Sequence, residues 1–178
     1  MGTIVAVEYL TLDGVMEGPA WSAPYFNEEL QRFQYDNLFA ADALLLGRVT
    51  YDEFKAAWPS MTDEKGFAER MNGMAKYVAT RTGGVPEWNA TFLEGDLVQA
   101  VTQLKATGQA LLVNGSGDLV NQLAAAGLID EYRFMVYPVV VGAGKQLFDQ
   151  RSAGLALTPT GSWTSASGVA VLTYQPAR

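Results

Sequence analysis

The stretch Ala43-Leu44-Leu45-Leu46-Gly47-Arg48-Val49-Thr50 decides the fold class, because an apolar run stops at a short loop that leads into a helix. The same change occurs twice more, from Tyr77-Val78-Ala79 into Thr80-Arg81-Thr82 and from Leu111-Leu112-Val113 into Asn114-Gly115-Ser116-Gly117. Short, continuously apolar strands are typical of a parallel sheet covered on both faces. Their carboxyl-terminal loops form the edge at which open α/β folds usually bind ligands.

Strands and helices alternate along most of the chain. Apolar runs predict strands at about 3–9, 43–46, 76–80, 109–114 and 131–141. We expect helices from Pro24, from Thr50 to before Pro59, from Asp96 to Ala106 and from Leu119 to Ala126. From Leu155 onward, apolar and polar residues alternate around Ser165-Ala166-Ser167-Gly168, which indicates an antiparallel hairpin. The sequence therefore predicts a single α/β domain over residues 1–178.

The composition limits the chemistry open to this chain. Its 178 residues are 49% hydrophobic, which suffices for one core, and they include no Cys and no His. Disulfides, Ser-His-Asp triads and histidine-ligated metals are thereby excluded, and we expect no metal site. The net charge of -7 argues against a nucleic-acid surface. We expect a cytoplasmic protein outside membranes, because no signal-like start and no apolar run of about 20 residues is present.

The three loops carry residue types that bind phosphate. Gly47 precedes a helix start, where free backbone N–H groups and the helix dipole attract an anion. Asn114 to Asp118 offers a second such place, although its Gly-x-Gly lacks the third glycine of the dinucleotide fingerprint. Thr80, Arg81 and Thr82 suit a phosphate monoester such as the 2′-phosphate of NADPH. Taken singly, each loop is better explained as an ordinary turn or strand end.

The order of these pieces resembles the dihydrofolate reductase-like superfamily, most closely the reductase domain of the bifunctional riboflavin-pathway enzyme. The matching segments are Thr11 to Met16, Leu46 to Tyr51, Trp58-Pro59, Thr80 to Thr82, Val113 to Gly117 and Leu128 to Phe148. The resemblance implies a three-layer fold with a mostly parallel central sheet, an antiparallel C-terminal hairpin and helices on both faces. It also implies a homodimer. The apolar stretch Phe134 to Val141 could support one, although a buried strand explains it equally well.

The resemblance further implies NADPH as cofactor, bound across the sheet edge, with the nicotinamide near Asp13 to Gly18. Asp13, and after it Glu17, are the candidate catalytic groups near the reacting centre. The candidate cofactor-binding residues are Gly47, Arg48, Val49, Thr50, Thr80, Arg81, Thr82, Asn114, Gly115, Ser116, Gly117, Asp118 and Leu119. Flat heteroaromatic substrates stack on aromatic walls, and the candidates for these walls are Trp21, Phe26, Tyr51, Trp58 and Tyr137.

Two positions depart from the family pattern and leave the substrate open. Phe26 stands where dihydrofolate reductases carry an acidic residue on the first helix, and Val7 stands where riboflavin-pathway reductases carry a lysine. We expect an NADPH-dependent reductase that transfers a hydride to a small heterocyclic substrate, pterin- or pyrimidine-like. The alternative is a module that binds NADPH or another nucleotide without turnover. A hydrolase using Asp130 and Glu131 is a more distant third.

Overall fold

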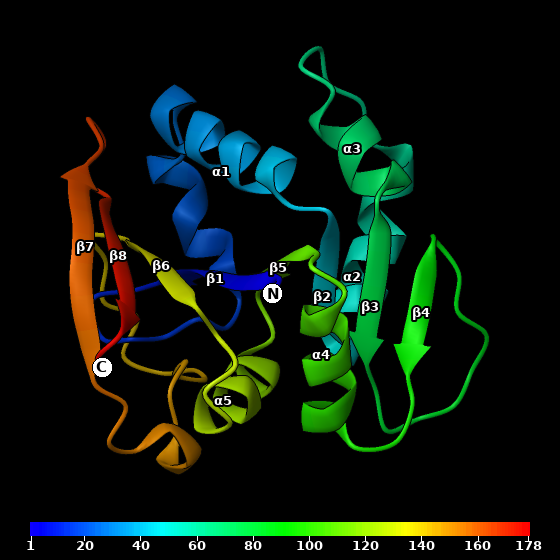
Figure 1. Ribbon diagram of the computed structural model, residues 1–178. Coiled ribbons are helices and arrows are strands. Elements are labelled where there is room, and N and C mark those ends of the chain that lie inside the picture. Colours follow the sequence, from blue (N-terminus) through cyan, green and yellow to red (C-terminus); the bar gives the residue numbers. More distant parts are fainter.

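One eight-stranded sheet organises the protein, described over residues 1–178 by a computed structural model (Figure 1). Its strands, in spatial order, are β4 (Ala90–Leu93), β3 (Ala75–Ala79), β2 (Ala43–Gly47), β5 (Ala110–Asn114), β1 (Thr3–Leu10), β6 (Glu131–Val136), β8 (Ala170–Pro176) and β7 (Leu157–Thr164). The first six are parallel, whereas β8 runs antiparallel to both β6 and β7. The predicted sheet and its C-terminal hairpin are confirmed.

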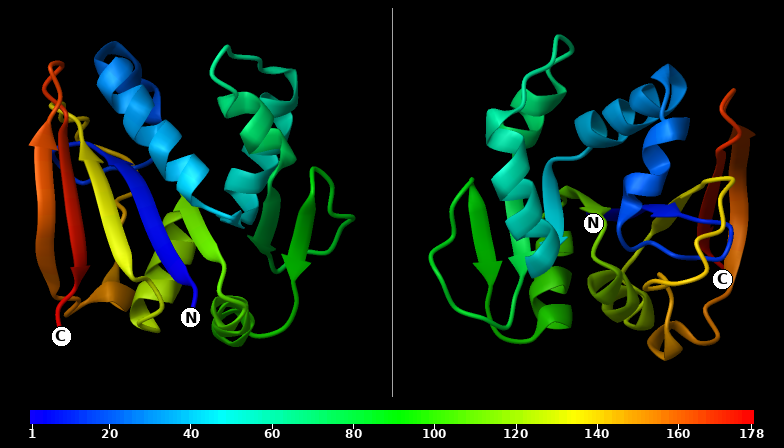
Figure 2. Two further views of the ribbon diagram at one scale, coloured as in Figure 1. Left: turned by 45° about the horizontal axis from the view of Figure 1, so that its top comes forward. Right: turned by 180° about the vertical axis from the view of Figure 1, so that it is seen from behind.

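Helices cover both faces of the sheet and make three layers (Figures 1 and 2). One face carries α1 (Glu28–Ala40), α2 (Arg48–Ala57) and α3 (Phe67–Gly73), and the other carries α4 (Leu97–Ala106) and α5 (Gly117–Ala125). Short 3-10 helices lie at Pro19–Tyr25, Trp58–Ser60 and Gln150–Ser152. No helix has the length and apolar character needed to cross a bilayer.

Side chains of β1 alternate between two cores, one on each face of the sheet. Ala6 packs into the cluster that contains Leu123 of α5, and Val7 packs into the cluster that contains Leu30 of α1. Burial on both faces is what the continuously apolar strands predict. The strand ends are thereby held rigidly, which fixes the loops that follow them.

Three helices begin at other residues than the sequence suggests. Helix α1 begins at Glu28 because the side chain of Asn27 accepts a hydrogen bond from the Leu30 N–H at 3.1 Å, whereas Pro24 lies in the preceding 3-10 segment. Helices α2 and α5 begin at Arg48 and Gly117, two residues earlier than expected. Their first turns therefore lie directly against the strand ends.

Strand β6 ends earlier than expected, at Val136. It lies between β1 and β8, and Phe134 and Met135 are buried there. The first part of the apolar stretch is thus an interior strand, while Val140 and Val141 are exposed. Burial accounts for the hydrophobic character of this stretch, and the homodimer stays a prediction.

Candidate functional site

A large cleft opens at the carboxyl ends of β1, β2, β3, β4 and β5, with a volume of about 1400 Å³. Pockets for one small ligand have volumes of roughly 300–1,000 Å³. The cleft therefore has room for a dinucleotide and a second molecule beside it. It lies where parallel strands of an α/β sheet end, the usual place for ligands in such folds.

The loops after β2, β3 and β5 line one part of the cleft, here called the loop end and made of Gly47–Thr50, Thr80–Thr82 and Asn114–Leu119. Every residue that the sequence analysis assigns to cofactor binding lies in this set. Residues separated by more than sixty positions are brought to one surface because their strands are neighbours in the sheet. Their assignment to the cofactor remains a proposal, taken up below.

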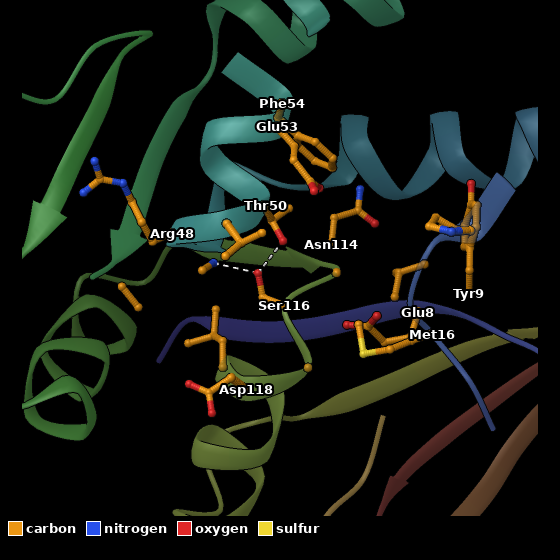
Figure 3. Close-up of a pocket in the computed structure, with 18 of the residues that line it drawn as sticks. Glu8, Tyr9, Met16, Arg48, Thr50, Glu53, Phe54, Asn114, Ser116 and Asp118 are labelled. Atoms are coloured by element: carbon orange, nitrogen blue, oxygen red, sulfur yellow. Dashed lines mark hydrogen bonds between the residues drawn. The ribbon is translucent and has the colours of Figure 1, made fainter. Parts of the chain in front are cut away.

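Ser116 ties two of these loops together (Figure 3). Its Oγ accepts a hydrogen bond from the Gly47 N–H at 2.8 Å and donates one to Thr50 Oγ1 at 2.8 Å. The loops approach so closely that a Cβ atom on Gly47 would lie 2.7 Å from Ser116 Oγ. Thr50 therefore serves as a partner of Ser116 within the first turn of α2, which begins two residues before it.

Replacing Gly47 with alanine is expected to force these loops apart, because the new methyl group overlaps Ser116. Overpacking of this kind costs about 1–3 kcal/mol. We expect a lower melting temperature, measured by thermal denaturation. Gly73→Ala is the matched control, because no atom lies within 4 Å of its added Cβ. Equal effects of the two substitutions would contradict the close approach.

Unpaired backbone donors line the loop end. The N–H groups of Gly115 and Ser116 make no hydrogen bond within the protein. Both residues have positive φ, 74° and 65°, so that consecutive N–H groups form a concave arrangement of the kind that binds anions. The first turns of α2 and α5 add N–H groups that have no partner inside their own helices. This surface therefore fits a phosphate group.

The two arginines of the loop end differ in availability. Arg48 pairs with Asp52 at 3.1 Å, donates to Thr80 Oγ1 at 3.2 Å, and lies 4.9 Å from the ring centre of Phe92. Its guanidinium is therefore engaged in joining α2 to the loop after β3. Arg81 is exposed and has neither an ion pair nor a hydrogen bond in its side chain. Arg81 is the free cation of the loop end.

A second part of the cleft, the aromatic end, is defined by Phe26, Phe54, Trp58, Met61, Phe67 and Met71. Helix α2 joins the two parts, since its first turn belongs to the loop end and Phe54 lies near its carboxyl end. Gln31 and Gln34 of α1 contribute amides nearby, and Gln34 Nε2 donates to Tyr9 OH at 2.9 Å. The aromatic end contains no lysine or arginine.

The aromatic residues assigned to the substrate divide into two groups. Phe26 and Trp58 line the cleft, whereas Trp21, Tyr51 and Tyr137 do not. Tyr51 is buried, and its OH donates to the Glu87 carbonyl and accepts from the Glu87 N–H. Tyr137 is also buried and has aromatic neighbours, with Trp21 at a ring distance of 5.3 Å. The structure therefore does not bring these three residues to the cleft.

Asp13 is not brought to the cleft. Its carboxylate accepts hydrogen bonds from Thr11 Oγ1 and, at 2.8 Å, from the Gly142 N–H. Hydrogen bonds from Thr11 and Gly142 hold the pKa of Asp13 below its ordinary value. These contacts join the loop after β1 to the loop after β6. Glu17, the second candidate, does line the cleft, and its Oε2 accepts from the Lys145 N–H at 2.9 Å.

Sequence reasoning missed Glu8, a cleft-lining residue on β1 (Figure 3). Glu8 is 2% exposed, and its Oε1 atom is enclosed without a hydrogen-bond partner. Burial raises the pKa of Glu8 from 4.5 to about 8. A carboxyl group in this environment holds its proton at neutral pH. The sequence signal was weak: a single acidic residue inside an otherwise apolar strand.

The acidic pair considered for a hydrolase has structural partners. Asp130 pairs with Lys105 at 2.7 Å and accepts from the Ile4 N–H at 2.8 Å. Glu131 pairs with Arg133 at 2.5 Å. Neither residue lines the cleft, so this alternative has no support in the structure.

Comparison with known proteins finds a family model and a relative that each match most of this chain. A family model of the RibD C-terminal domain matches residues 3–171. The uncharacterized protein YyaP of Bacillus subtilis (strain 168) is 29% identical over 169 residues, covering 93% of this chain and 90% of that protein.

Solved structures share the fold. A candidate riboflavin biosynthesis protein from Shewanella sp. PV-4 gives a TM-score of 0.81 at 20% identity, with 99% of each chain covered. The diaminohydroxyphosphoribosylaminopyrimidine deaminase/5-amino-6-(5-phosphoribosylamino)uracil reductase of Thermotoga maritima gives a TM-score of 0.67 at 13% identity, covering 99% of this chain and 57% of that one. At these identities the similarity speaks for the fold alone.

Proposed function

The chain belongs to the RibD C-terminal domain family, and on that premise we propose that it is an NADPH-dependent reductase acting on a small heterocyclic substrate. The observation that carries the proposal is the loop end of the cleft. There, unpaired backbone N–H groups of Gly115 and Ser116 and the free guanidinium of Arg81 line one continuous surface. A dinucleotide with an additional phosphate is the ligand that this donor set fits.

In this proposal, different residues of the loop end bind the pyrophosphate and the 2′-phosphate of the cofactor. The concave backbone at Gly115 and the helix starts at Arg48 and Gly117 would hold the pyrophosphate, since they offer neutral donors and helix dipoles. Thr80, Arg81 and Thr82 would hold the 2′-phosphate. A cation that the protein leaves unpaired is explained by a ligand that carries the missing charge.

The aromatic end supports a flat, uncharged substrate. Phe26 and Trp58 offer ring faces, and Gln31 and Gln34 offer amide donors and acceptors. A phosphate on the substrate would find no cation there, and it would face the carboxylates of Glu53 and Asp63. We therefore propose a pterin- or pyrimidine-like ring without a phosphate group in that part of the cleft.

The reaction proposed is hydride transfer to the carbon of a C=N or C=O bond, and the hydride is supplied by NADPH when bound. The residues of this chain orient and desolvate the reactants. The strand ends fix the cofactor loops, and the walls of the aromatic end exclude water from the reacting atoms. Glu17, at the rim of the cleft, is proposed as a polar contact near the reacting centre.

A panel assay tests this function. Oxidation of NADPH is followed in the presence of dihydrofolate, a set of pterins and a set of pyrimidines, each pyrimidine with and without a phosphate group. Turnover of an unphosphorylated ring above the turnover of its phosphorylated partner is the expected result. NADPH binding without oxidation across the panel would instead favour the alternative, a module that binds the nucleotide and does not turn it over.

A further inference from the structure

Glu8 differs from every other acid in the cleft. The other cleft-lining carboxylates are exposed and belong to Glu17, Glu53, Asp63, Asp96 and Asp118. Asp63 and Asp96 bind backbone N–H groups at helix starts, and Asp118 pairs with Arg151 at 2.6 Å. Glu8 alone is buried, at 2% exposure, and no protein group hydrogen-bonds with its carboxyl group.

A buried carboxyl group without a partner is costly, because water no longer solvates it and nothing replaces the water. Nearly all buried polar groups in proteins find a hydrogen-bond partner. Because Glu8 lines the cleft, a bound ligand can reach its carboxyl group. Glu8 points to the same face of β1 as Ala6, on the α5 side of the sheet, and Figure 3 shows it beside Met16.

We propose that Glu8 is the proton donor of the reductase, delivering its proton to the nitrogen or oxygen of the double bond that receives the hydride. This inference rests on the proposed function. The substrate carbon accepts the hydride with its electron pair, the π electrons move to the nitrogen or oxygen, and that atom takes the carboxyl proton. Glu8 is left as a carboxylate and regains a proton from water through the cleft mouth.

The surroundings of Glu8 explain why it can hold a proton. Phe134 of β6 lies opposite Glu8 in the strand register, and β5 ends beside it at Asn114, so neither neighbouring strand presents a charge there. None of the other titratable residues that line the cleft hydrogen-bonds with Glu8; they are Tyr9 on β1 itself and, from other elements, Glu17, Arg48, Glu53, Asp63, Arg81, Asp96, Asp118 and Lys145. Burial alone raises its pKa to about 8.

No other cleft residue is suited to the same role. Cysteine and histidine are absent from the chain. The Tyr9 hydroxyl is engaged by Gln34, and burial raises the pKa of Tyr9 further above its ordinary value. The other cleft-lining carboxylates are exposed to water, so none has the buried setting of Glu8.

The test compares Glu8→Gln with Glu69→Gln, which removes an exposed carboxylate of α3 that lies outside the cleft. Glutamine keeps the size of Glu8 and is neutral, so that the fold is retained while the transferable proton is lost. Proton transfer by a positioned side chain contributes about 10²–10⁴-fold to rate. We expect kcat of Glu8→Gln to fall at least about 100-fold with the best ring of the panel, whereas kcat of Glu69→Gln should stay within about threefold of the unmodified protein. The NADPH affinity of both variants should stay within about threefold of the unmodified protein.

Two further measurements separate a proton donor from a structural residue. Turnover of the unmodified protein should decline above about pH 8, where Glu8 ionises, and Glu8→Gln should lack that decline. Infrared difference spectra should show the carbonyl band of an un-ionised carboxylic acid at pH 7 that is absent in Glu8→Gln. Turnover of Glu8→Gln close to that of the unmodified protein, or absence of this band, would overturn the role of Glu8 as proton donor. Neither result would contradict the proposed reductase function. Failure of the unmodified protein to oxidise NADPH would overturn both.

Discussion

Alanine in place of Arg81 is expected to weaken NADPH binding by about 10- to 100-fold and to leave NADH binding nearly unchanged. Hydrogen bonds to charged groups contribute about 1.5–3 kcal/mol, which corresponds to that range of affinity. Arg81 is exposed and makes no contact that stabilises the protein, so its loss should act on the ligand alone. The measurement is a fluorescence titration of Arg81→Ala with each dinucleotide.

Arg32→Ala is the matched control for this experiment. Arg32 is an exposed arginine on α1 that lies outside the cleft, so its removal changes the net charge equally. If both substitutions weaken NADPH binding to the same degree, the effect comes from the long-range electrostatic field of the protein rather than from a contact between Arg81 and the phosphate. The contact between Arg81 and the 2′-phosphate should also weaken as salt is added, because salt screens exposed charges.

Glu8→Gln is expected to change how the free energy of unfolding depends on pH. Between pH 4.5 and about 8, the native state retains a proton on Glu8 that the unfolded chain has released. The unmodified protein therefore loses stability as pH rises through this window, and the loss is complete above a pKa of about 8. At about 1.4 kcal/mol for each pH unit, the full effect approaches about 5 kcal/mol.

Urea denaturation at pH 5 and pH 8 measures this effect. The stability of Glu8→Gln relative to the unmodified protein should increase between the two values, because glutamine does not ionise. Glu69→Gln supplies the comparison, since the carboxylate of Glu69 is exposed in the folded protein. Parallel pH profiles for the unmodified protein and Glu8→Gln would contradict the burial of an un-ionised acid at this position.

Local signals explain which parts of the fold could be predicted. The run Ala43 to Leu46 followed by Gly47 specifies a buried strand and a turn within a few residues, and the structure has both. Helix α3 and strand β4 lacked such signals, because each is short and neither has a regular apolar period. Helix α3 depends on packing against α1 and the 3-10 helix at Trp58–Ser60, and β4 depends on pairing with β3, rather than on their own sequence.

In the cleft too, the sequence predicted the residues whose position follows from local structure and not those whose position depends on tertiary packing. Loop residues at strand ends must meet at one edge of a parallel sheet, so the loop end followed from the strands alone. Which aromatic side chains face the cleft does not follow from spacing, and Tyr51 and Tyr137 proved to be core residues. Glu8 was missed for a related reason: whether a strand acid is covered depends on the segments that pack over it.

The most direct test of the proposed function is to titrate the unmodified protein in parallel with NADPH and with NADH. Binding is monitored by tryptophan fluorescence. Trp58 lines the cleft and should report a bound ligand. We expect saturable binding with a clear preference for NADPH, because Arg81 is free to bind the additional phosphate. Binding of neither dinucleotide would contradict the proposed reductase and leave only the shared fold.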